Sequence, residues 1–233
     1  MIMKCKILIW GASSKTLIAL NMIKNNQIYY GNKKIKNGKV VLLADPMLKK
    51  PKFETNIFFV NKKNDFIKNI NKANFFIAGI GGAHGKARYL LSQELIKKKL
   101  LPLNLIHNTS YVDKTSAIGL GIQIMPNAVV HCNSQVGDFT ILNTSSTVDH
   151  ECVIGKGVHV MGGASIAGRV KIGNYVTIGT NATILPEIQI SDGAFIGAGA
   201  VVTKNVKKNE IVAGNPAKYL KQNKHIVNLS YFR

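Results

Sequence analysis

A repeat with a period of six residues runs through the second half of the chain, from Ile106 to about Val206. Every sixth residue from Ile106 to Val202 is aliphatic, and the residue four positions after each of them is small or β-branched. An amphipathic helix would repeat at about 3.6 residues and a strand at two. A fixed period of six instead indicates a solenoid in which each hexapeptide supplies one short strand and one turn.

Three successive hexapeptides are expected to form one triangular coil. The aliphatic residues then point inward, the small residues fill the corners, and successive coils hydrogen-bond at about 4.8 Å. Since nothing interrupts the repeat between residues 106 and 206, no long loop should project from the coils. The sequence therefore predicts an all-β parallel β-helix over residues 106–206, followed by a short tail over residues 207–233 that caps its open end.

The first 105 residues follow a different pattern, in which apolar strand-like runs alternate with helix-like stretches. Strands are expected at residues 6–10, 39–44, 56–60 and 74–80, with helices up to residue 23 and from after residue 85 to about 99. Such alternation predicts a parallel sheet, here in a Rossmann-like α/β domain over residues 1–105. Ligands bind such sheets at the carboxyl ends of the strands, where Gly11, Asp45 and Gly81 lie.

The first turn of this domain argues against a dinucleotide site. In the dinucleotide fingerprint two further glycines follow the first, whereas Gly11 is followed by Ser13 and Lys15. A smaller nucleotide-sugar site suits the size of the domain better. Lys15, at the start of the first predicted helix, could meet a phosphate there or remain solvated.

The net charge of +20 is carried by the two ends of the chain. Residues 1–105 contain 20 lysines and arginines against 4 acidic residues, residues 106–206 contain 5 against 6, and residues 207–233 contain 6 against 1. The basic residues are not interleaved with aromatic ones, so the charge does not indicate nucleic-acid binding. It fits either a solvated surface excess or the attraction of small polyanions such as nucleotide diphosphates and coenzyme A.

The sequence indicates neither membrane insertion nor secretion. The chain has no run of 18 apolar residues, and its N-terminal apolar stretch, residues 7–12, is shorter than a signal-peptide core and lacks a cleavage pattern. The three cysteines, Cys5, Cys132 and Cys152, have no metal-binding spacing and fit reduced thiols. A cytoplasmic protein is therefore expected.

One turn of the repeat differs in chemistry from the others, which consist mostly of Gly, Asn, Ser and Lys. It carries Asp149, His150 and Glu151, so one imidazole is flanked by two carboxylates. Either carboxylate can orient the imidazole and raise its basicity, which is the arrangement that a general base requires.

Two other chemistries fit the repeat less well. Cys152 could form an acyl-cysteine, but it occupies the inward column of small residues and is expected to be buried and inert. A zinc site needs three converging imidazoles, and the spacing of His131, His150 and His159 does not bring them together. No metal site is predicted.

The chain resembles a known family over its whole length, most clearly over residues 140–218. The motifs are residues 143–155, His159, residues 163–164, residues 168–173 and residues 214–218. They resemble the bacterial sugar O-acyltransferases of the sialic-acid O-acetyltransferase type (NeuD/PglD-like), a group that includes acetyl-CoA-dependent N-acetyltransferases of UDP-4-amino-4,6-dideoxy sugars. The resemblance implies that the β-helix is left-handed, that the protein is a homotrimer, and that acetyl-CoA is its co-substrate.

The resemblance also implies roles for residues of the β-helix. His150 is the catalytic base, Glu151 or Asp149 supports it, and Gly168 offers a backbone N–H to the oxyanion. The spacing of three hexapeptides from His150 to Gly168 places the two residues one coil apart, which fits a shared cleft. Acetyl-CoA is expected to contact Gly168, Gly163, Ala164, Gly214, Pro216 and Lys218.

The acceptor implied by the resemblance is a nucleotide-activated amino sugar, with a UDP-linked sugar as the first choice. Lys15 or Arg88 would face its diphosphate, and Asp45 would bond a ribose hydroxyl or the base edge. His159 would lie near the substrate across a subunit boundary. The full set of predicted substrate residues is Gly11, Ser13, Lys15, Asp45, Gly81, Gly82, Arg88 and His159.

The N-terminal half departs from the family at the positions that hold the nucleotide and the sugar. Lys15 stands where a histidine is common, one carboxylate is missing before Asp45, and the turn at residues 81–88 is longer. The sequence thus predicts an acetyl-CoA-dependent N-acetyltransferase of a nucleotide-activated amino sugar in surface-glycan biosynthesis. The alternatives are O-acetylation of a sialic or other nonulosonic acid and a non-catalytic sugar-binding trimer.

Overall fold

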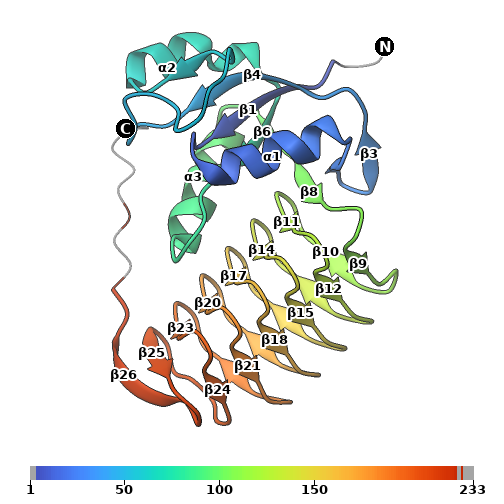
Figure 1. The fold of residues 1–233 in the computed structure, drawn as a ribbon, viewed down its shortest axis with the longest axis vertical. Helices are drawn as coiled ribbons and strands as arrows, with labels where there is room; N and C mark the ends of the chain where they lie inside the picture. The colour runs from blue at the N-terminus through green and yellow to red at the C-terminus, as the bar shows by residue number, and fades with distance from the viewer. Residues whose placement is uncertain (1–3, 225–226, 228–233) are drawn as a thin grey trace.

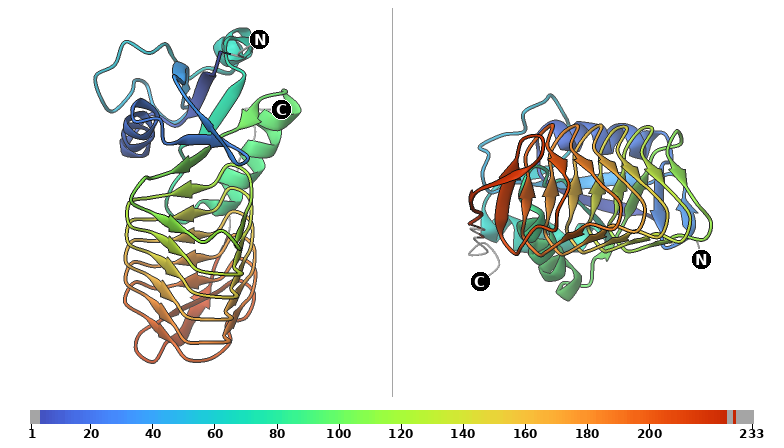
Figure 2. Two further views of the ribbon diagram at one scale, coloured as in Figure 1. Left: turned by 90° about the vertical axis from the view of Figure 1, so that its right-hand side faces the viewer. Right: turned by 90° about the horizontal axis from the view of Figure 1, so that it is seen from below.

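The computed structural model describes residues 4–224 and 227. An α/β region built from the N-terminal residues sits on one end of a long stack of short strands (Figure 1). Figure 2 shows the stack from the side and from below, where successive coils repeat with nearly the same outline.

The N-terminal region contains a five-stranded parallel sheet with the strand order β5-β4-β1-β6-β7. Its strands are β1 (Lys6–Trp10), β4 (Lys39–Ala44), β5 (Phe59–Val60), β6 (Phe75–Ala78) and β7 (Leu101–Pro102). The helices are α1 (Ser14–Lys24), α2 (Lys63–Asn69) and α3 (Gly85–Lys97), with a short 3-10 helix, η1 (Ile70–Lys72). The parallel sheet expected from the alternation of strands and helices has formed. None of the helices described is long and apolar enough to cross a membrane.

The hexapeptide repeat forms a β-helix of two-residue strands that begins with the three-residue β8. The strands are β8 (Asn104–Ile106), β9 (Tyr111–Val112), β10 (Ala117–Ile118), β11 (Gln123–Ile124), β12 (Val129–Val130), β13 (Gln135–Val136), β14 (Ile141–Leu142), β15 (Thr147–Val148), β16 (Val153–Ile154), β17 (His159–Val160), β18 (Ser165–Ile166), β19 (Lys171–Ile172), β20 (Thr177–Ile178), β21 (Thr183–Ile184), β22 (Gln189–Ile190), β23 (Phe195–Ile196) and β24 (Val201–Val202). Strands of successive coils pair in parallel, as β12 does with β15, where Val130 lies opposite Val148. The stacked parallel sheets and the repeat fit the predicted left-handed β-helix.

The interior of the β-helix contains the two residue columns that define the repeat. Aliphatic residues such as Val130 and Val148 and small residues such as Ala164 are fully buried. Between residues 121 and 199, each hexapeptide also has one residue in the left-handed backbone region, as at Ser145 and Glu151. A left-handed residue with a Cβ costs about 1–2 kcal/mol, so the geometry of the coil, and not local preference, places the Glu151 side chain.

Two hairpins extend the sheet that contains β8, β11 and β17, and the sequence did not predict either. Near the N-terminus, β2 (Ile28–Tyr30) pairs with β3 (Lys33–Ile35) and with β8, antiparallel in both cases. Near the C-terminus, β25 (Glu210–Ala213) continues the stack by pairing in parallel with β23, and β26 (Lys218–Gln222) folds back on it. The expected tail is therefore a strand hairpin as far as residue 222, and its last residues lie outside those described.

Candidate active site

His150 and Glu151 form a hydrogen-bonded pair in the turn between β15 and β16. The imidazole Nδ1 lies 2.9 Å from the Glu151 Oε2, and the two side chains are 40% and 52% exposed. Because a carboxylate can only accept, the neutral imidazole carries its proton on Nδ1 and presents a lone pair on Nε2. This tautomer and orientation suit a general base that acts through Nε2.

Asp149 has a different role from Glu151. Its Oδ1 accepts a hydrogen bond from the His150 backbone N–H at 2.7 Å. The carboxylate of Asp149 therefore fixes the backbone of the turn, whereas Glu151 holds the ring. Of the two carboxylates that the sequence left open, Glu151 is thus the one that contacts the imidazole.

Gly168 lies against the His150 imidazole from the next coil, as the hexapeptide spacing predicts. A Cβ on Gly168 would overlap the ring, and Nε2 is the ring atom closest to it. The Gly168 carbonyl accepts from the Glu187 N–H at 3.1 Å, so the backbone of this glycine is fixed beside the imidazole. The close approach requires a glycine at residue 168.

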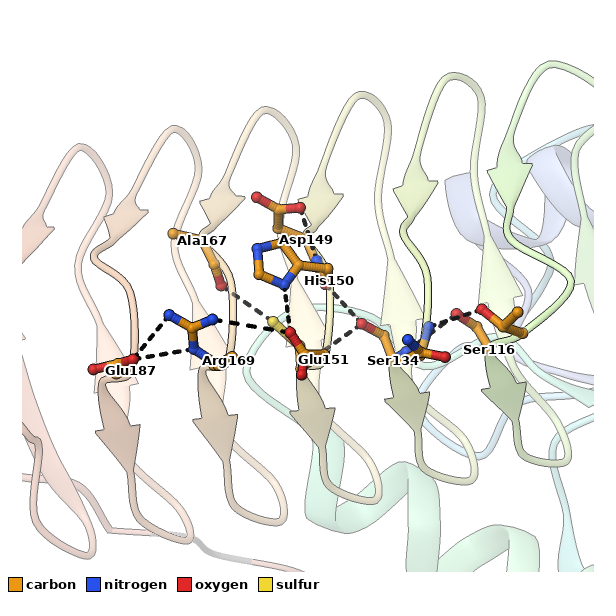
Figure 3. Close-up of polar contacts among 11 residues, drawn as sticks. Ser116, Ser134, Asp149, His150, Glu151, Ala167, Arg169 and Glu187 are labelled. Atoms are coloured by element: carbon orange, nitrogen blue, oxygen red, sulfur yellow. Dashed lines mark hydrogen bonds and ion pairs between the residues drawn. The ribbon is translucent and has the colours of Figure 1, made fainter.

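A chain of charged side chains runs along the same corner of the β-helix (Figure 3). Arg169 donates to Glu187 from Nε at 3.0 Å and lies within 2.9 Å of it through Nη2. Its Nη1 also lies 4.0 Å from the Glu151 Oε2 that faces His150. The sequence analysis did not identify Arg169 and Glu187 as site residues. Their spacing of one and two coils after Glu151 would have predicted that the three charged side chains are neighbours.

A ladder of small polar residues lies just inside this corner (Figure 3). Ser134 donates from its hydroxyl to the Asp149 carbonyl at 2.6 Å and accepts from the Cys152 N–H at 3.0 Å. The Cys152 thiol in turn donates to the Ala167 carbonyl at 3.1 Å. The backbone on both sides of His150 is therefore held by the Ser134 hydroxyl.

Cys152 is fully buried, as its place in the inward column predicts. Burial raises the pKa of its thiol. A buried thiol that donates to a backbone carbonyl is a poor nucleophile, so the geometry does not favour an acyl-cysteine. Within the described residues, no group of three or more His, Cys, Asp or Glu side chains could hold a metal ion.

The predicted first turn of the N-terminal region is tied together by Asp45. One carboxylate oxygen of Asp45 accepts from the Ala12 N–H and the other from the Met47 N–H, both at 3.0 Å. Gly11 has a left-handed φ of 118° and donates to the Ala44 carbonyl. Ser13 occupies the N-cap of α1 without a side-chain capping bond.

Four of the predicted substrate residues meet where the N-terminal region contacts the β-helix. We call this cluster the junction site: Lys15, Gly81, Gly82 and His159. The aliphatic stem of Lys15 packs against Gly81, where a Cβ would lie 3.1 Å from the Lys15 Cε. His159, on β17, is 3% exposed, and its Nδ1 donates to the Gly82 carbonyl at 2.9 Å.

Both nitrogen-bearing side chains of the junction site have a buried atom without a hydrogen-bond partner among the described residues, Lys15 Nζ and His159 Nε2. Burial, followed by the nearby charge of Arg88, lowers the pKa of Lys15 to about 8. Burial also lowers the pKa of His159 to about 4, with smaller contributions from Arg88 and Lys15. Since His159 is neutral and donates through Nδ1, its Nε2 is an acceptor. The resemblance puts His159 near the substrate at a subunit boundary, whereas here the imidazole faces a loop of its own chain.

Arg88 is not accessible to a ligand at the carboxyl edge of the sheet. Its side chain is completely buried, and the guanidinium donates to the carbonyls of Ile80, Phe139, Gly157 and Val158 at 2.7–3.1 Å. Burial lowers its pKa to about 9. The expectation that Arg88 contacts a diphosphate is therefore wrong, because the side chain is completely buried and four of its five donors are bonded to backbone carbonyls inside the junction.

Of the residues expected to contact acetyl-CoA, Gly168 lies against His150, and the others lie elsewhere in the chain. Gly163 has a left-handed φ of 68° in the turn after β17, at a different corner of the coil from Glu151. Ala164 is completely buried, and its N–H and carbonyl are both bonded within the β-helix, so the expectation that it contacts acetyl-CoA is wrong. Gly214 and Pro216 lie in the turn between β25 and β26, and Lys218 is the first residue of β26; all three are exposed.

Comparison with known proteins points to one group of enzymes. A family profile described as bacterial transferase hexapeptide (six repeats) matches residues 151–186. The structure of WeeI from Acinetobacter baumannii aligns with a TM-score of 0.77 and 28% identity, covering 93% of this chain and 100% of that chain. The acetyltransferase domain of PglB from Neisseria gonorrhoeae, in complex with acetyl coenzyme A, aligns with a TM-score of 0.76 and 25% identity, covering 93% and 100%.

A more distant structure has the same fold. A mutant of perosamine N-acetyltransferase from Caulobacter crescentus, in complex with CoA and GDP-perosamine, aligns with a TM-score of 0.81 and 19% identity, covering 93% of this chain and 97% of that chain. No curated protein matches the sequence significantly. Together, the profile and the WeeI and PglB structures confirm the predicted resemblance to hexapeptide-repeat sugar acetyltransferases of the NeuD/PglD type.

Proposed function

We propose that this chain, a hexapeptide-repeat acyltransferase, transfers an acetyl group from acetyl-CoA to the amino group of a nucleotide-activated amino sugar. The observation that carries the proposal is the His150–Glu151 pair, which directs the basic Nε2 toward the backbone of Gly168. Acetyl coenzyme A in the PglB domain and GDP-perosamine in the Caulobacter enzyme support the two substrate classes. A UDP-linked dideoxy sugar in surface-glycan biosynthesis is our first candidate for the acceptor.

In the proposed reaction, acetyl-CoA supplies an acetyl group activated as a thioester. His150 Nε2 accepts a proton from the sugar amine as the nitrogen attacks, and Glu151 stabilises the imidazolium that forms. The Gly168 N–H donates to the developing oxyanion. His150 then returns the proton to the departing thiolate, which leaves the chain in its starting state. A positioned base of this kind contributes about 10²- to 10⁴-fold in rate.

We assign the acceptor to the N-terminal region, residues 1–105. The ammonium of Lys15 and the acceptor Nε2 of His159 are both buried and unpartnered within the described chain, so they offer one donor and one acceptor to a polar ligand. A diphosphate would satisfy Lys15. Asp45 already accepts two backbone N–H groups, but each carboxylate oxygen retains a lone pair for a ribose hydroxyl or base edge.

We further propose that the active protein is a homotrimer in the cytoplasm. His150 and Glu151 lie on an open corner of the β-helix over residues 106–206, so a neighbouring copy would supply the second wall of the cleft. Acetyl-CoA would lie along this groove and contact Gly163. Its nucleotide end would reach the β25–β26 hairpin in residues 207–233, at Gly214, Pro216 and Lys218. Light scattering of active protein at the mass of a monomer would contradict this assembly.

Acetyl transfer from acetyl-CoA to a panel of UDP-, GDP-, dTDP- and CMP-linked amino sugars tests the function. The same panel should include free amino sugars, which test whether the acceptor needs a nucleotide, and a nonulosonic acid, which tests the alternative of O-acetylation. We expect transfer to at least one nucleotide-linked amine and its loss in His150→Asn. The matched control is His131→Asn, which removes an exposed imidazole one coil earlier. Equal turnover of the wild type and His150→Asn would refute the assignment of the base.

A further inference from the structure

Arg88 is a buried cation that is hydrogen-bonded by backbone carbonyl groups. It lies on α3, and its guanidinium bonds one carbonyl of the N-terminal region, Ile80, and three of the β-helix, Phe139, Gly157 and Val158. Within residues 4–224 and 227 it forms no ion pair with a carboxylate. Burying an arginine without a counterion is unfavourable, so these four carbonyls are the compensation that the fold provides.

The carbonyls bonded by Arg88 lie next to the junction site on both sides. Ile80 directly precedes Gly81 and Gly82, and Val158 directly precedes His159. Gly82 and His159 are joined to each other by the 2.9 Å hydrogen bond from Nδ1. The Arg88 guanidinium therefore connects the loop that carries Gly82 to the strand that carries His159.

The packing around Arg88 leaves little room for adjustment. A Cβ on Gly85 would overlap the Gly157 carbonyl, and a Cβ on Gly157 would lie 2.8 Å from the Gly85 carbonyl. One helical turn further on, Tyr89 packs edge-on against Phe139, with ring centroids 5.9 Å apart. The start of α3 is therefore docked closely on the β-helix, with the guanidinium at the centre of the contact.

We infer that Arg88 is the positioning residue of the acceptor site: it sets the separation of Gly82 and His159 without touching the ligand. This inference rests on the proposed function, because it concerns the site assigned to the sugar nucleotide. The planar guanidinium has five donors in a fixed arrangement, which allows one side chain to bond four carbonyls from two regions. A lysine has three donors on a single nitrogen and cannot bond all four at these positions.

The test is Arg88→Lys, which keeps the positive charge and removes the planar guanidinium with its five donors. We expect the KM for the sugar nucleotide to rise about tenfold or more, because a displacement near 1 Å at a binding site is costly. The KM for acetyl-CoA should stay unchanged. Hydrogen–deuterium exchange should become faster in peptides that cover residues 79–86 and 156–161. An unchanged acceptor KM, or an equal rise in both KM values, would overturn the inference.

Gln123→Met is the matched control, because Gln123 is also buried and also spans the two regions. Its amide donates to the Ala78 carbonyl at 2.7 Å, but it bonds neither the 80–84 loop nor β17. This variant should unfold at a lower temperature and keep the acceptor KM and the exchange of both peptides. A Gln123→Met phenotype identical to that of Arg88→Lys would reduce the role of Arg88 to general stability and refute the inference.

Gly82→Ala tests the same inference if the Arg88 variants do not fold. Gly82 has a left-handed φ of 59°, and a Cβ there would lie 3.6 Å from the His84 Cδ2, so an alanine perturbs the loop through its backbone and leaves Arg88 intact. It should raise the acceptor KM and leave the acetyl-CoA KM unchanged; an unaltered acceptor KM would contradict the inference. If the wild type acetylates no acceptor, the proposed function has failed, while the exchange measurements still decide whether Arg88 holds the two segments.

Discussion

The imidazole of His150 lies against the backbone of Gly168, with Nε2 as the ring atom that a Cβ at residue 168 would meet first. The two residues are one coil apart, and the parallel pairing of β15 with β18 places the two coils in register. The imidazole and the Gly168 backbone are therefore positioned by the same hydrogen-bond ladder. A change at either residue should act directly on the chemistry.

Gly168→Ala should abolish most of the activity. The added methyl group would displace the imidazole, and an error near 1 Å in a catalytic group costs on the order of 10²-fold in rate. The control is Gly162→Ala, where the nearest atom to a new Cβ, the Thr144 carbonyl oxygen, would be 3.4 Å away. Steady-state kcat of both variants is the measurement. Similar kcat values would contradict the placement of the ring.

Glu151→Gln should lower kcat far more than Asp149→Asn. The Glu151 carboxylate fixes the Nδ1 proton of His150, and an amide in its place can stabilise the wrong tautomer; the loss expected for a base is about 10²- to 10⁴-fold. An asparagine at residue 149 can still accept from the His150 N–H, so its effect should be below about tenfold. Equal losses in the two variants would show that the carboxylates share the role.

Ser134→Ala should destabilise the protein by about 1–3 kcal/mol. The substitution leaves the buried Cys152 N–H without its acceptor and the Asp149 carbonyl without its donor. Ser146→Ala is the control, because the buried Ser146 hydroxyl has no partner among the described residues. That variant should be as stable as the wild type or more so. Urea denaturation measures the free energy of unfolding of both variants. The prediction is wrong if Ser146→Ala is less stable than Ser134→Ala.

The repeat in the sequence predicts the catalytic corner because a solenoid converts sequence spacing into position. A separation of three hexapeptides means one coil, so His150 and Gly168 could be placed together without coordinates. The same rule identifies Glu151, Arg169 and Glu187 as one column, once the turn positions are examined for charge pairs.

The junction site could not be derived in this way. Arg88 bonds backbone carbonyls as far as 70 residues away. Because every residue has a backbone carbonyl, the residue types in the sequence do not show which carbonyl accepts the hydrogen bond. The strand-end rule places Lys15 and Gly81 at one edge of the sheet, but it does not show that β17 packs against that edge. Strand β3 was missed for a local reason, since its Lys33–Ile35 segment is lysine-rich and lacks an apolar alternation.

The burial of His159 predicts a loss of stability as the pH falls from about 6.5 to 4. Its pKa is lowered to about 4 in the folded chain against about 6.5 when unfolded. In this interval the unfolded chain binds the proton and the folded chain does not, so stability decreases with decreasing pH. The full effect of a shift of this size is about 3 kcal/mol. His159→Gln keeps a donor for the Gly82 carbonyl and removes the titration, so its free energy of unfolding should fall less over this range.

The control is His131→Gln, whose side chain is exposed and whose pH dependence should match that of the wild type. Denaturant titrations at intervals of half a pH unit decide it: identical slopes for the wild type and His159→Gln would mean that the imidazole is not buried in the folded protein.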